Sequence, residues 1–161
     1  MSQQNPSQMI PAPTSLRLKV GANRMGAIDA AAIAKAEAAL QSLAGNFGEW
    51  LQDEIVKLEA ARQQVRDTGV TVETMENLYL RAHDLKGLGT TYGYQLITRI
   101  AGSLCRLIDE KDKRLTAPMP LVDAHIDAIK ASVREEMKSD DHPVGSALVM
   151  ALEQKVTAAG C

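Results

Sequence analysis

Aromatic residues are scarce in this 161-residue sequence, which contains one Trp, one Phe and three Tyr. Aromatics make up 3% of the chain, whereas hydrophobic residues make up 45%. Strands favour β-branched and aromatic side chains, and proteins that bind single-stranded nucleic acid stack bases on aromatic rings. The composition therefore argues against all-β folds and against base-stacking functions. The apolar residues that are present are mainly Ala and Leu, which favour helices.

Cysteine, long apolar runs and an excess of one charge are also lacking. Cys105 and Cys161 are too few for a disulfide framework, and no apolar run approaches the ~18 residues that span a bilayer. The net charge is −2, without a basic stripe, so we expect no binding to nucleic acid or to a membrane. The N-terminus lacks the apolar core of a signal peptide. We expect a cytoplasmic protein.

Apolar residues recur at helical spacing from Gly26 onward. Residues 1–25 show no such period, and we expect them to form a flexible tail before a single domain at 26–161. Short connections favour antiparallel neighbours, so the expected fold is all-α, an antiparallel four-helix bundle with additional flanking helices. The predicted helices carry apolar stripes at Ile28–Leu43, Phe47–Val65, Met75–Leu85, Leu96–Ile108, Val122–Met137 and Val144–Val156.

Several local features of these helices can be predicted. Gly45 and Gly48 are expected to separate the first two helices, with Phe47 and Trp50 as core anchors between them. The fourth helix is expected to end in the charged run 109–114, within which residues 111–114 indicate a solvated helix end with cations near the C-terminal dipole.

Two glycines break the helix rules near the end of the third predicted helix, in Ala82-His83-Asp84-Leu85-Lys86-Gly87-Leu88-Gly89. Gly costs about 0.8–1 kcal/mol relative to Ala inside a helix. At about 100° per residue, Gly89 falls on the core side of the helix, where a missing side chain permits close packing. Gly87 falls instead on the face of His83. That face points away from the apolar stripe, so we expect His83 to be accessible to solvent.

The residues around His83 favour nucleophilic chemistry on phosphorus. Imidazole is nucleophilic near physiological pH, because its unperturbed pKa is about 6.5, and it can attack an acyl phosphate. Lys86 can offset the charge of the phosphoryl oxygens, and Gly87 leaves room for a partner to approach. The sequence has no Gly-rich phosphate loop, so the donor must come from that partner. Other residues on this face are Glu76, Tyr79 and Thr90.

Ala82-His83-Asp84-Leu85-Lys86-Gly87, with Gly93 closing the following turn, resembles the signature of the histidine phosphotransfer (HPt) domain of bacterial phosphorelays. The motif covers residues 78–108, and the order of predicted helices is compatible over residues 45–140. The sequence departs from the family at Leu88, where Ala or Ser is usual, and at Thr90, where Gly, Ser or Asn is frequent.

The resemblance implies a monomeric four-helix bundle that carries phosphoryl groups. His83 would accept a phosphoryl group from an aspartate of one receiver domain and pass it to another. Lys86 would position that group, and Gly87 would give the receiver access. Because Glu76, Tyr79 and Thr90 share the face of His83, they are candidate contacts with the partner, although a solvated helix face explains them equally well. The implied partners are receiver domains of response regulators and a hybrid histidine kinase. No cofactor and no kinase activity of its own are implied, and Mg²⁺ would come with the receiver domain.

Two other functions remain open at this stage. A dimeric phosphotransferase built on a histidine-kinase-like hairpin would normally carry an α/β ATPase-like domain, but the residues after His83 read as helices. A helical adaptor would bind receiver domains without being phosphorylated. The remaining histidines do not have the spacing of metal ligands. We expect His125 to be a surface residue and His142 to belong to a turn or a helix cap.

Overall fold

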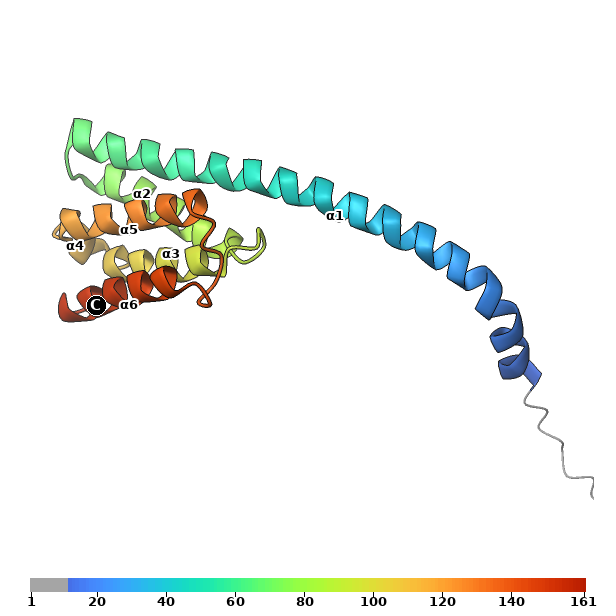
Figure 1. Cartoon of the computed structure of the whole chain (residues 1–161). Helices are drawn as coiled ribbons and strands as arrows, with labels where there is room; N and C mark the ends of the chain where they lie inside the picture. The colour runs from blue at the N-terminus through green and yellow to red at the C-terminus, as the bar shows by residue number, and fades with distance from the viewer. Residues whose placement is uncertain (1–11) are drawn as a thin grey trace, which may run out of the picture. The chain divides into compact units, whose positions relative to one another are not determined.

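The computed structural model describes the backbone of residues 12–161 and the side chains of residues 29–161. This part of the chain is all-helical and contains no strand, as expected. None of its helices combines the length and apolar character needed to cross a membrane. The helices are α1 (Ala12–Thr68), α2 (Val72–Leu88), α3 (Gln95–Ile108), α4 (Lys111–Arg114), α5 (Met119–Arg134) and α6 (Pro143–Ala158) (Figure 1).

The chain divides into two units, residues 1–44 and residues 45–161. In the first unit the described residues belong to α1, which begins at Ala12. Part of the predicted tail, residues 12–25, is therefore helical although its sequence shows no helical period. The rest of that tail, residues 1–11, lies outside the described residues.

Helix α1 is continuous, so the prediction of two helices separated at Gly45 and Gly48 is wrong. A Cβ atom at either glycine would meet nothing within 4 Å, so no close contact requires them. Glycine weakens a helix by about 0.8–1 kcal/mol relative to Ala, but it does not by itself reverse the chain. The apolar spacing from Leu43 through Phe47 to Leu51 keeps one helical phase across this stretch.

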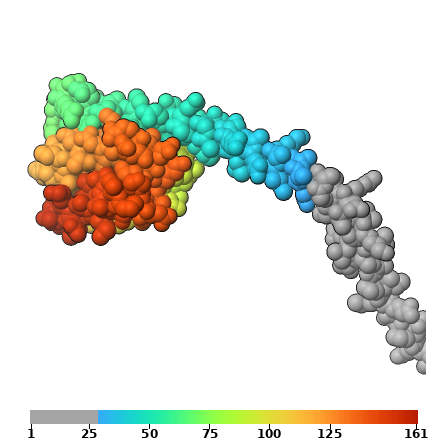
Figure 2. Space-filling view, viewed as in Figure 1, coloured from blue at the N-terminus to red at the C-terminus, as the bar shows by residue number. Residues whose placement is uncertain are grey.

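The second unit contains the buried core, and α3 is its central helix. Helix α3 packs against α2, α4, α5 and α6, and α5 also packs against α6. In the space-filling view α5 and α6 form one continuous surface (Figure 2). Helix α1 enters the core through Leu51, Ile55, Leu58, Ala61 and Val65, which are all buried.

The aromatic residues of α1 lie at the edge of this core. The ring centroids of Phe47 and Trp50 are 5.5 and 6.3 Å from that of Tyr92. Trp50 is 46% exposed, so the prediction that it anchors the core is wrong.

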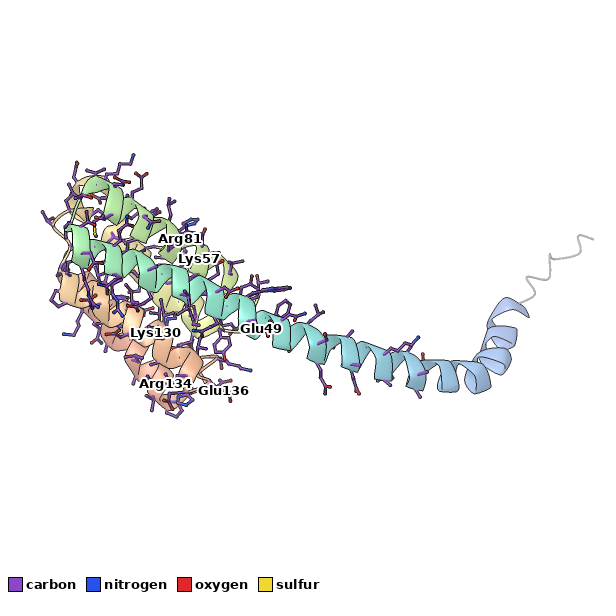
Figure 3. The ribbon with its side chains drawn as sticks, turned by 90° about the horizontal axis from the view of Figure 1, so that it is seen from above. Glu49, Lys57, Arg81, Lys130, Arg134 and Glu136 are labelled. Carbon is purple, nitrogen blue, oxygen red and sulfur yellow. The ribbon has the colours of Figure 1, made fainter. Side chains whose placement is uncertain are left out.

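An ion-pair network joins α1 to α5 within the second unit. Arg62 is only 4% exposed, and its Nη1 donates to Asp127 Oδ1 at 2.7 Å. Lys130 of α5, labelled in Figure 3, donates to Glu59 Oε2 of α1 at 3.1 Å. Because a buried guanidinium without a carboxylate is costly, these pairs fix how this part of α1 sits on α5.

The junction between α2 and α3 is tightly packed at Gly89. A Cβ atom on Gly89 would lie 2.5 Å from Thr98 Oγ1 and 2.7 Å from Thr98 N, which is closer than atoms can pack. The Thr90 N–H donates to Thr98 Oγ1 at 2.8 Å, and the Tyr94 N–H donates to the Gly89 carbonyl at 2.8 Å. Gly93 closes the turn at φ +84°, a conformation that favours glycine. The predicted packing role of Gly89 is confirmed.

His125 is fully buried between α3 and α5, so the prediction of a surface residue is wrong. Its Nδ1 lies 2.7 Å from the Leu121 carbonyl and its Nε2 lies 3.0 Å from Ser103 Oγ. Because a carbonyl only accepts, Nδ1 carries the proton and Nε2 accepts from the hydroxyl of Ser103. Burial lowers the pKa of His125 below its usual 6.5. His142 behaves as predicted, since it caps α6 by accepting from the Gly145 N–H at 3.2 Å.

The buried neutral state of His125 predicts a pH-dependent stability. Below pH 6.5 the unfolded chain binds a proton that folded His125 does not, so the free energy of unfolding falls as the pH drops from 6.5 toward the folded-state pKa. The slope is at most about 1.4 kcal/mol per pH unit for one proton. Urea unfolding over this range measures the slope, and His125→Gln should reduce it. An unchanged slope in that variant would contradict the assignment.

Candidate functional site

Helix α2 has one buried face and one exposed face. Thr71 caps its first turn: the Thr74 N–H donates to Thr71 Oγ1 at 3.1 Å, and the Thr71 N–H donates to Thr74 Oγ1 at 3.0 Å. This reciprocal pair leaves fewer unpaired donors at the helix start. The buried face carries Met75, Leu78, Ala82 and Leu85, each 0% exposed. His83 is on the other face and is exposed, as the helical spacing predicts.

The imidazole of His83 stands beside the ring of Tyr79, one turn earlier on α2. The two ring centroids are 6.0 Å apart, and the rings are inclined at 43°. Within residues 29–161, no hydrogen bond or ion pair joins His83 to another side chain. A ring nitrogen of His83 is therefore free to use its lone pair on an incoming group.

Tyr79 is held in place from two sides. Its hydroxyl donates to Asp109 Oδ1 at 2.9 Å, a bond that raises the pKa of the phenol above its usual value. The guanidinium carbon of Arg114 lies 4.4 Å from the centroid of the Tyr79 ring, within the range of a cation–π contact. The Tyr79 ring is therefore held in a fixed position beside His83.

Arg114 itself is anchored by the end of α3. It donates to the Ile108 carbonyl at 2.7 Å and to the Asp109 carbonyl at 3.0 Å, and it is 6% exposed. The prediction that residues 111–114 form a solvated helix end is wrong for this residue. These residues form the separate short helix α4, and Arg114 turns inward to satisfy the free carbonyls at the end of α3.

Lys86 lies one turn after His83 and is exposed. Its aliphatic stem crosses α3 at Gly102, where an added Cβ atom would lie 3.9 Å from Lys86 Cδ and Cε. Residues three apart on a helix are neighbours, so Lys86 and His83 occupy adjoining positions on the exposed face of α2. Nearby Cys105 is buried, and this burial raises the pKa of its thiol to about 11. The thiol is therefore protonated near neutral pH and is not a competing nucleophile.

Gly87 has no packing role within the described chain. A Cβ atom added there would meet nothing within 4 Å, in contrast to Gly89 two residues later. The absence of a side chain at Gly87 therefore leaves open space on the surface of α2, one turn from His83. An approaching partner could use this space.

The other two predicted contact residues, Glu76 and Thr90, differ in whether their side chains are bonded elsewhere in the protein. Glu76 is exposed on the face of His83. Thr90 is also exposed, but its hydroxyl donates to Thr98 Oγ1 at 3.0 Å and so belongs to the junction with α3. The sequence reasoning missed Leu80, which is 52% exposed and lies one turn before His83. The sequence does indicate Leu80, because it is an apolar residue outside the buried stripe of α2.

An exposed imidazole with no side-chain partner among the described residues has the chemistry of a nucleophile, and the exposed Lys86 adds a positive charge to the same helix. Among the residues whose side chains are described, no three His, Cys, Asp or Glu gather as ligands for a metal ion.

The chain matches no protein-family model, no curated protein and no solved structure.

The two glycines of α2 are expected to respond oppositely to alanine. Gly87→Ala should raise the free energy of unfolding by up to about 1 kcal/mol, because Ala favours a helix and meets no neighbour. Gly89→Ala should lower it by about 1–3 kcal/mol, because its Cβ would displace Thr98. Urea unfolding of both variants gives the two values. Equal effects of the same sign would show that the contrast between the sites is absent.

Proposed function

We propose that this chain is a histidine phosphotransfer protein. His83 accepts a phosphoryl group from the aspartyl phosphate of one receiver domain and passes it to the aspartate of another. The observation that carries the proposal is an exposed imidazole without a hydrogen-bond partner among the described side chains, beside an open surface at Gly87. The sequence resemblance to HPt domains supports the same function.

In the transfer, the lone pair of an unprotonated ring nitrogen of His83 attacks phosphorus. A P–N bond forms as the P–O bond to the partner's carboxylate breaks, and that carboxylate leaves with the electron pair. The other ring nitrogen keeps its proton. The return step reverses these changes on a second receiver domain. Lys86 stabilises the charge on the phosphoryl oxygens, and Mg²⁺ enters with the receiver.

The proposed scaffold is an antiparallel four-helix bundle made of the part of α1 within the second unit, α2, α3 and α5, flanked by α4 and α6. The buried residues of α1 and α2 and the central position of α3 support this arrangement. A rigid scaffold serves the reaction because it presents His83 at a fixed orientation to each receiver domain.

The docking surface for the receiver domain is the exposed face of α2. Leu80 offers an apolar side chain that is 52% exposed, and Gly87 offers a gap on the other side of His83. Glu76 and Lys86 add one charge of each sign at its margins. An apolar centre with a polar rim is usual for protein interfaces.

Substitution of the nucleophile tests the proposal. A receiver domain with a labelled aspartyl phosphate should transfer its label to the wild-type protein and not to His83→Gln. His142→Gln is a matched control that should still accept the label, because His142 caps α6 and is not part of the site. Label that persists on His83→Gln, or no transfer from any receiver domain of the same cell, would refute the function.

Removal of the Lys86 charge should slow the transfer without unfolding the protein. Because the side chain is exposed, Lys86→Met should change the free energy of unfolding by no more than about 0.5 kcal/mol. The rate of phosphotransfer should fall about tenfold, which equals about 1.4 kcal/mol of transition-state stabilisation. Single-turnover transfer kinetics measure this effect, and an unchanged rate would exclude Lys86 from the reaction.

A further inference from the structure

The first unit of the chain presents an apolar helix face that none of its own described residues covers. Ile33, Leu40 and Leu43 are 55%, 64% and 42% exposed. Together with Ala36 they lie on one side of α1 at spacings of three, four and three residues. We propose that this stripe, residues 33, 36, 40 and 43, pairs with the same stripe of a second copy of the chain.

The spacing is that of a helix pair. Alternating steps of three and four residues repeat every 3.5 residues on average, which is the period of two helices that pack side by side. In the sequence the same steps continue to Phe47 and Trp50. A lone surface helix has no need for this pattern, because exposed positions are normally polar.

The residues beside the stripe favour a second copy as the partner. The flanking positions are Ala32, Ala39 and Ala44, with Glu37 as a single charge among them, so another helix can approach closely. Large side chains at positions 33, 40 and 43 provide knobs, while Ala36 leaves a hole that a large side chain can fill. A face with both features is complementary to itself, as a symmetric dimer requires.

Helix stability gives an independent reason for a partner. Isolated helices are marginal in water and take most of their stability from packing of an apolar face. In α1 the glycines at 45 and 48 further weaken the helix, and neither makes a close contact. Pairing of the exposed stripe would supply the missing packing.

The size of the stripe predicts a weak and reversible dimer. Residues 29–44 span about 24 Å of helix, and a helix is about 10 Å wide. The strip is much smaller than the roughly 800 Å² per partner of a standard stable interface. Monomers should therefore prevail at low concentration, as the HPt resemblance implies, and dimers should appear as the concentration rises. This inference does not depend on the proposed phosphotransfer.

Sedimentation velocity of the full chain tests the dimer, at concentrations from about 1 μM to about 1 mM, the range of weak association. The weight-average mass of the wild type should rise from that of a monomer toward that of a dimer. Leu40→Glu should shift the midpoint to at least about tenfold higher concentration, because it places a charge in the stripe. Ala38→Glu, which adds the same charge about 200° around the helix, should leave the midpoint unchanged.

If circular dichroism shows that Leu40→Glu has lost helix content, Leu40→Ala tests the dimer in its place. Ala is a strong helix former, and the loss of the Leu40 side chain should still weaken the dimer. A wild type that stays monomeric over the whole range would overturn the proposal. An equal effect of Ala38→Glu and Leu40→Glu would do the same. So would loss of the dimer on Leu80→Glu, because that result would locate the interface on α2.

Discussion

The close approach of Gly89 to Thr98 is the contact on which the site depends. It lets the end of α2 lie against the start of α3 at a distance that admits no side chain, and Thr98 Oγ1 then accepts the Thr90 N–H. With that end fixed, and with the apolar face of α2 buried, the helix cannot rotate about its axis. His83, on the opposite face, is therefore held toward solvent.

The surroundings of His83 combine rigidity with openness. Tyr79 is held by Asp109 and by the buried Arg114, so one side of the imidazole is a fixed wall. On the other side Gly87 leaves open space. A phosphocarrier needs one nucleophile at a fixed orientation and access for large partners, not an enclosed pocket. The unremarkable charge and the few aromatic residues of this chain are compatible with that role.

Local patterns predicted much of the fold and the site. The exposed face of His83 and the packing role of Gly89 followed from helical spacing, which depends only on neighbours in the sequence. The continuity of α1 was missed because glycine was read as a helix end, although it only weakens a helix. The burial of Arg114 and His125 could not be predicted, since it depends on partners in other segments: the end of α3 for Arg114, and Ser103 for His125.

The most direct test of the central claim is the location and chemistry of the transferred phosphate. After incubation with a phosphorylated receiver domain, peptide mapping by mass spectrometry under alkaline conditions should find the phosphoryl group on His83 and on neither His125 nor His142. The bond should be stable in base and labile in acid, as a phosphoramidate is. A phosphate on another residue, or one that survives acid, would contradict the account.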